Sequence, residues 1–164
     1  MRLTAHSAPR IARAAALSAC VVAAFAAASA QADPADDAIK ARRGFFTLLG
    51  AEIGPLGAMA KGETPYDADA AKRHAANLQA LAGYRFGDLF VAGSSNDDKF
   101  GDTRALPVIW TDTAGFSEKA GGLVAAIGAL QGVAGEGQAA LAGGVGALGK
   151  SCGACHDTYR AKEF

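Results

Sequence analysis

The C-terminal part of the chain carries an apolar stripe with helical spacing, and two cysteines belong to that stripe. Its members recur at spacings of 4, 3, 4, 3 and 4 residues, at Leu141, Val145, Leu148, Cys152, Cys155 and Tyr159. This spacing places all of them on one face of a helix. The helix must bury that face against other elements, and the two thiols therefore point toward the interior of the fold.

Cys152, Cys155 and His156 form the pattern Cys-x-x-Cys-His, which is typical of covalent haem attachment. Thiols three residues apart are neighbours on a helical face, so each can form a thioether with one vinyl group of the same porphyrin. His156 stands one turn beyond Cys152, which brings its imidazole over the porphyrin as an axial iron ligand. We expect one haem c, bound through both cysteines, with His156 as the metal ligand.

Three other interpretations of this motif fit the sequence less well. A structural zinc site needs four ligands, and outside the motif and the first 32 residues only His74 remains as a usual nitrogen or sulfur ligand. A redox-active cysteine pair belongs to a βαβ pattern, and no strand-like run lies near it. A disulfide between Cys152 and Cys155 would close too tight a loop on a helix. We expect His74 to be a surface residue.

The N-terminus has the pattern of a secretory signal peptide. Three arginines precede an apolar stretch over 14–27, and small residues follow it. We expect a signal peptide over residues 1–32, cleaved after Ala30 or Ala32, and a haem-binding domain over residues 33–164. Export of this kind predicts a periplasmic location, the compartment in which bacteria attach c-type haem.

The expected mature domain has 132 residues, enough for one domain with its own core. It carries 13 basic and 16 acidic residues, and two haem propionates would add further negative charge. Such a weakly acidic balance argues against nucleic-acid binding, and no second apolar stretch is long enough to span a membrane. A lipoprotein site at Cys20 is a weaker alternative, because the apolar region continues past this cysteine.

Helical spacing continues through the whole domain. We expect helices over 34–61, from an N-cap at Asp67 to about Leu81, from about Trp110 to Ala134, and through the stripe described above. A long connection over 83–107, with one helical turn, separates the second helix from the third. These elements predict an all-α fold, an up-down-up-down four-helix bundle with covalently attached haem in its interior.

With this pattern the chain resembles the class II c-type cytochromes, and within them the cytochrome c′ family. The likeness rests on residues 152–156, 157–160, 41–49 and 57–67, while the connection over 83–107 has no clear counterpart. The resemblance implies a four-helix bundle, often a homodimer, with a five-coordinate high-spin haem whose sole protein ligand is His156. It also implies binding of small diatomic gases such as NO and CO, without catalytic turnover.

Three further residues are candidates for haem contacts. The resemblance places Phe46 over the vacant face of the iron as an apolar gate, and Arg160 near the face that carries His156. Arg42 lies one turn before Phe46 on the apolar stripe, and a haem propionate is its expected partner. Each has a plainer interpretation, with Phe46 as an ordinary core aromatic, Arg42 as a solvated residue and Arg160 as a cation at a helix end.

The alternative function is that of a low-spin electron-transfer cytochrome of the same class, in which a methionine of the first helix is the sixth iron ligand. The mature domain has one methionine, Met59. It stands 13 positions after Phe46, or ~20 Å along a straight helix, so both cannot lie over one iron. We expect Met59 to be a packing residue, and gas binding remains compatible with a redox partner protein.

Overall fold

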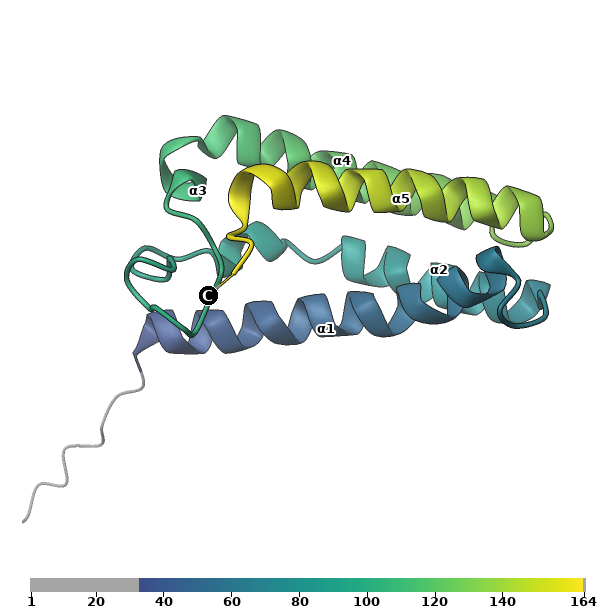
Figure 1. Cartoon of the computed structure of the whole chain (residues 1–164), viewed down its shortest axis with the longest axis horizontal. Coiled ribbons are helices and arrows are strands. Elements are labelled where there is room, and N and C mark those ends of the chain that lie inside the picture. The colour runs from purple at the N-terminus through teal and green to yellow at the C-terminus, as the bar shows by residue number, and fades with distance from the viewer. Residues whose placement is uncertain (1–32, 164) are drawn as a thin grey trace, which may run out of the picture. The chain divides into compact units, whose positions relative to one another are not determined.

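The computed structural model describes residues 33–163, so the predicted signal peptide, its cleavage sites and Cys20 lie outside the described residues. The described elements are helical (Figure 1): α1 (Pro34–Lys61), α2 (Ala68–Ala82), the 3₁₀ turn η1 (Phe86–Leu89), α3 (Val108–Thr111), α4 (Thr113–Val133) and α5 (Gln138–Tyr159). Within this part of the chain the one β-type pairing is an isolated antiparallel bridge between Ala105 and Arg160.

Four of these helices form a bundle. α1 packs against α2 and α5, and α4 packs against α5 and α2, so each long helix has two neighbours. Figure 1 shows the pairs α1–α2 and α4–α5 lying one above the other along the same long axis. This arrangement confirms the predicted all-α four-helix bundle. No helix between residues 33 and 163 is both long and apolar enough to cross a membrane.

Local signals set the ends of α1 and α2. The Asp33 carboxylate accepts a hydrogen bond from the N–H of Ala35, and Pro34 occupies the first turn, where its missing N–H costs nothing. Gly62 ends α1 in the left-handed conformation with φ 75°. Asp67 caps α2 as predicted, by accepting from the N–H groups of Asp69 and Ala70.

The predicted start of the third helix was wrong. Trp110 lies in the separate short helix α3, and α4 begins only at Thr113. The reason is Asp112, whose non-helical backbone (φ −113°, ψ 60°) breaks the helix and whose carboxylate accepts from the N–H of Gly115. The predicted single turn in the long connection is confirmed by η1.

The connection between α2 and α3 is fastened to the first turns of α1. The Lys99 ammonium lies 2.6 Å from a carboxylate oxygen of Asp33 and 2.7 Å from one of Asp36. Arg42 of α1 donates hydrogen bonds to Ser94 and Thr103. These contacts hold the connection over one end of the bundle.

The bundle has a well-packed core, and Tyr66 joins the segment after α1 to the α4–α5 turn. The fully buried core side chains include Leu56, Leu78, Ile127, Leu130, Leu141 and Leu148. Tyr66, which follows α1, donates to the carbonyl of Ala134 and accepts from the N–H of Gly137, at 2.9 and 3.0 Å. Its hydroxyl thereby bonds to the residue that follows α4 and to the residue that precedes α5.

Candidate haem site

A cavity of about 730 Å³ lies at the end of the bundle where the long connection is fastened. Its walls come from α1, α4, α5, the connection and the C-terminal segment, and its volume is that of a pocket for a cofactor-sized ligand. Cys152, Cys155 and His156 all line it. The structure therefore gathers the whole Cys-x-x-Cys-His motif at one cavity, as the inward stripe of α5 predicts.

Both cysteines are half-buried free thiols and form no disulfide. Burial raises the pKa of both Cys152 and Cys155. Desolvation, with the charge of Arg104, lowers the pKa of His156, which favours the neutral form that binds metals. The site thus presents two thiols and an imidazole to the same space.

Arg160 lies beside His156, as the sequence analysis expected. Its Nη1 is 3.2 Å from His156 Nδ1, one turn back along α5. The backbone of Arg160 is fixed by the bridge to Ala105, and Ala161 N–H donates to the carbonyl of Arg104. A guanidinium can only donate, so in this arrangement Nδ1 accepts and the proton of a neutral imidazole lies on Nε2. Arg160 itself is held against the connection.

A residue pair that the sequence analysis missed holds the end of α5 in place. The hydroxyl of Tyr159 donates a 2.6 Å hydrogen bond to the carboxylate of Asp112, the N-cap of α4. This bond lowers the pKa of Asp112 and raises the pKa of Tyr159 to about 12. The sequence analysis placed Tyr159 on the apolar stripe but did not find its partner. An aspartate just before a helix is a typical N-cap, and this pattern at Asp112 could have drawn attention to it.

Phe46 lies on α1 and lines the cavity, as do residues of α5. It is 38% exposed, so it is not a fully buried core aromatic, and its ring meets Phe86 edge to face at 5.9 Å between centroids. Sequence analysis missed three other aromatic lining residues, Phe86, Phe90 and Phe116. The first two stand four residues apart within a segment of turn composition, where no helical stripe marks them.

Arg42 is buried, so the alternative that it is a solvated residue is wrong. Only 5% of it is exposed, and its guanidinium donates to the carbonyls of Leu89 and Ser94 and to the hydroxyls of Ser94 and Thr103. It also lies over the ring of Phe90 at 4.7 Å. These described partners are all neutral, and burial together with the charge of Arg43 lowers the pKa of Arg42 to about 10.

Two other residues have clear positions. Met59 is buried in the apolar core and does not line the cavity, which agrees with the packing role expected for it. His74 is not a simple surface residue, because it is partly buried and its Nδ1 lies 2.7 Å from Glu52 Oε2. This contact joins α2 to α1 and lowers the pKa of Glu52.

The residues around the cavity fit a haem group. The thiols and the imidazole lie on one helix, five aromatic rings supply apolar walls, and the buried guanidinium of Arg42 lacks an anionic partner among the described residues. A porphyrin with two carboxylates matches this donor set, because a buried cation bound only by neutral groups is stabilised by an anion.

Comparisons with known proteins agree with this geometry. The family model described as "Cytochrome C'" matches residues 37–160. A cytochrome c' from Cereibacter sphaeroides is 47% identical over 135 residues, covering 82% of this chain and 90% of that protein.

Solved structures give the same result. The structure of cytochrome c' from Rhodobacter Spheriodes is similar with a TM-score of 0.76 and 47% identity, covering 79% of this chain and 98% of that chain. A nitric oxide complex of a cytochrome c prime variant from Alcaligenes xylosoxidans matches with a TM-score of 0.68 and 34% identity, covering 80% and 98%. The chain therefore belongs to the cytochrome c′ family and is a c-type haem protein.

Proposed function

We propose that the chain is an exported, periplasmic haem protein that binds NO and CO at a five-coordinate iron. Cys152 and Cys155 hold the porphyrin through thioethers, and His156 is the axial ligand. The haem supplies one open iron position for a diatomic gas. The nitric oxide complex of the Alcaligenes xylosoxidans relative supports this choice of ligand.

One observation carries the proposal: among the described residues that line the cavity, His156 is the only histidine, and none is a methionine. Met59, the methionine that the low-spin alternative requires, is packed in the core instead. The Tyr159 hydroxyl is bound to Asp112. Neither a second histidine nor a methionine is therefore at hand as a sixth ligand among the described lining residues.

Three other residues of the site have separate roles in this proposal. Phe46 lines the cavity as an apolar gate, which small ligands pass more easily than larger anions. Arg42 binds one propionate, and Arg160 lies beside the imidazole of His156. No Asp or Glu lines the described cavity, so the gas side offers no carboxylate for acid–base chemistry. This favours reversible binding over catalytic turnover.

The decisive experiment is an optical spectrum of the reduced holoprotein with and without CO. A high-spin spectrum that shifts on CO addition supports the open iron position, whereas a low-spin spectrum indifferent to CO contradicts it. The gate is tested by Phe46→Ala, which we expect to raise the CO association rate about tenfold, equivalent to ~1.4 kcal/mol of barrier. Leu48→Ala is the matched control on α1, because Leu48 is exposed and does not line the cavity.

We further propose a homodimer, in keeping with the resemblance. Leu48 of α1 is 55% exposed and Tyr84, after α2, is 52% exposed, and both line a second apolar groove on the α1–α2 side. A two-fold contact through this groove would cover both side chains. Sedimentation of wild type and Leu48→Glu tests it: the variant should be monomeric, and an unchanged dimer would exclude this face.

A further inference from the structure

Tyr159 is a buried ionisable side chain of the cavity wall for which gas binding has no use. Only 3% of it is exposed, and it lines the cavity together with Cys155 and His156. With Ala105 and Ile109 it forms a small core cluster, against which Cys155 packs. Because Cys155 would carry one thioether of the haem, Tyr159 belongs to the immediate surroundings of the cofactor.

The hydroxyl of Tyr159 has a base as its partner. It donates to the carboxylate of Asp112 at 2.6 Å, a length typical of an O–H group bound to an anion. This bond is the main cause that raises the pKa of Tyr159 to about 12 and lowers the pKa of Asp112. At neutral pH the pair is therefore a phenol bound to a carboxylate, with the proton on the tyrosine.

Such a pair suits the donation of an electron. A phenol that has lost an electron is a much stronger acid than the phenol itself, so it gives up the electron more easily when the proton can leave as well. The carboxylate of Asp112 is already within the reach that proton transfer needs. Asp112 is exposed and does not line the cavity, so it can pass the proton on to solvent. The electron and the proton of Tyr159 thus have separate routes.

The other easily oxidised rings of the described chain do not share this position. The sequence has three tyrosines and one tryptophan, and only Tyr159 lines the cavity. Tyr66 donates to a backbone carbonyl, and so does the indole N–H of Trp110. Tyr84 is 52% exposed in the groove on the α1–α2 side. Tyr159 therefore combines the cavity wall with a carboxylate acceptor.

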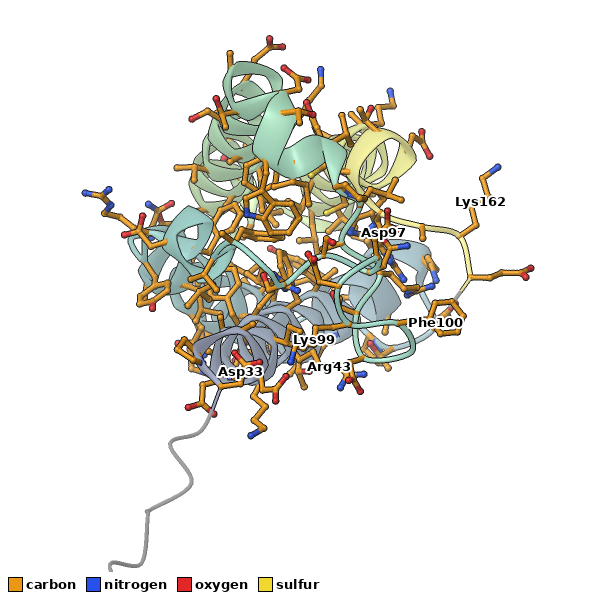
Figure 2. The ribbon with its side chains drawn as sticks, turned by 90° about the vertical axis from the view of Figure 1, so that its left-hand side faces the viewer. Asp33, Arg43, Asp97, Lys99, Phe100 and Lys162 are labelled. Carbon is orange, nitrogen blue, oxygen red and sulfur yellow. The ribbon has the colours of Figure 1, made fainter. Side chains whose placement is uncertain are left out.

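The packing around Tyr159 shields the ring. Its carbonyl accepts from the N–H of Leu106 at 3.0 Å, and its ring meets Phe116 edge to face at 5.4 Å between centroids. Leu106 belongs to the connection that Lys99 fastens to the start of α1, and Figure 2 shows Lys99 and Asp33 at this end of the bundle. A radical on so covered a ring is kept from coupling with a second protein molecule.

We propose that Tyr159 is a redox-active tyrosine, which gives an electron to the haem and a proton to Asp112 when hydrogen peroxide reaches the iron. The inference rests on the proposed open iron position, which would admit peroxide as a small neutral molecule. Ferrous iron alone supplies one electron, and reduction of peroxide by one electron yields hydroxide and a damaging hydroxyl radical. A second electron from Tyr159 completes the reduction to water.

The step consumes one hydrogen peroxide per reduced protein. The O–H bond of Tyr159 breaks, its proton passes through Asp112 to solvent, and a neutral tyrosyl radical remains. Ferrous iron gives the other electron and becomes ferric. Hydrogen peroxide takes both electrons with two protons from solvent, its O–O bond breaks, and two waters form. Tyr159 thereby protects the haem without the repeated turnover of a peroxidase.

The first test looks for the radical by electron paramagnetic resonance. Reduced holoprotein is mixed with an equimolar amount of hydrogen peroxide and frozen within milliseconds. Wild type should give a tyrosyl signal that narrows when the protein carries ring-deuterated tyrosine. Tyr159→Phe should lose this signal, and Tyr66→Phe, the matched control, should retain it. A signal of equal size in Tyr159→Phe, or none in wild type, would overturn the proposal.

Asp112→Asn tests the proton acceptor and keeps the start of α4 capped. Asparagine caps a helix about as well as aspartate and its amide oxygen can still accept from Tyr159, but it takes up no proton at neutral pH. We expect the radical yield to fall severalfold. In wild type the radical should also form more slowly in D₂O, which a merely structural role of Asp112 would not cause. An unaltered yield in Asp112→Asn would exclude Asp112 as the acceptor and refute the proposal.

Bleaching of the haem by excess peroxide measures the protection. Absorbance of the haem should fall severalfold faster in Tyr159→Phe than in Tyr66→Phe, because the hydroxyl radical is no longer avoided. Equal rates in the two variants would contradict a protective role.

CO binding, recorded for every variant, keeps the two proposals apart. If wild type binds CO but forms no tyrosyl radical, the inference on Tyr159 is refuted while gas binding stands. A wild-type holoprotein that fails to bind CO contradicts the gas-binding function, and the tyrosyl signal still decides the role of Tyr159.

Discussion

The hydroxyl of Tyr159 and the carboxylate of Asp112 join the end of α5 to the start of α4 through a 2.6 Å hydrogen bond. Cys155 and His156 lie within one turn of Tyr159, so this bond positions the part of α5 that carries the haem motif. The same carboxylate also accepts from the N–H of Gly115. One acidic side chain therefore caps one helix and anchors another.

Tyr159→Phe should make the protein less sensitive to alkaline pH. An unfolded tyrosine ionises near pH 10, whereas the pKa of Tyr159 in the fold is raised to about 12, chiefly by its bond to Asp112. The stabilisation is therefore complete below pH ~10 and is lost as the pH rises toward 12. We expect the variant to be less stable than wild type at neutral pH and the difference to shrink over this range.

Urea unfolding at intervals between pH 7 and pH 12 measures this effect. Tyr84→Phe, measured on dilute monomeric protein, is the control, because Tyr84 is 52% exposed in the single chain and the variant should follow the same course as wild type. Parallel curves for wild type and Tyr159→Phe across the alkaline range would contradict the prediction.

Gly115→Ala tests the space around the same pair. A Cβ at this position would contact the carboxylate of Asp112 and the hydroxyl of Tyr159, so one of the two must move. We expect a loss of about 1–3 kcal/mol in the free energy of unfolding, as overpacked sites show. Gly121→Ala, on the same helix with no atom nearby, should instead stabilise by about 0.5–1 kcal/mol. If both variants are more stable than wild type, Asp112 and Tyr159 can move aside without loss of stability, and the prediction is contradicted.

Tyr66→Phe should destabilise the end of the bundle remote from the cavity. The substitution leaves the carbonyl of Ala134 and the N–H of Gly137 without the hydroxyl that joins them. A loss of about 1–3 kcal/mol is expected from unsatisfied buried groups. Hydrogen exchange should rise at Gly137 while the haem spectrum stays the same, and a spectral change would mean that the two ends are coupled.

Met59→Leu should leave the haem spectrum unaltered. Met59 is buried in the core and absent from the cavity lining, and an exchange of similar volume costs less than about 1.5 kcal/mol. Spectra of the oxidised and reduced holoprotein check this directly. Loss of a ligand band in the variant would make Met59 an iron ligand and restore the electron-transfer alternative.

Sequence patterns predicted best what depends on neighbours along the chain. The stripe of α5 and the cap at Asp67 follow from spacings of a few residues, and both are confirmed. The start of the third helix was misplaced because the apolar spacing runs on through Trp110, although the backbone of Asp112 interrupts the helix. Apolar spacing favoured a continuous helix and the aspartate favoured a new helix start, and spacing alone cannot show which of the two prevails.

Contacts between distant segments were beyond such patterns. The stripe suggested that Arg42 faces inward, but its partners Ser94 and Thr103 lie 52 and 61 positions away. His74 and Glu52 are 22 positions apart on different helices, so the contact between them left no periodic signal. These contacts arise from how the helices and the connection pack.

The cavity unites the two ends of the domain, since Arg42 and Phe46 belong to α1 and His156 and Arg160 to the end of α5. Almost the whole domain must be looped back before this pocket exists, and closing so long a loop carries a large entropic cost that slows folding. A haem attached covalently to α5 would present an apolar surface against which α1 can pack. Attachment before folding would thus shorten the search that brings the first helix to the last.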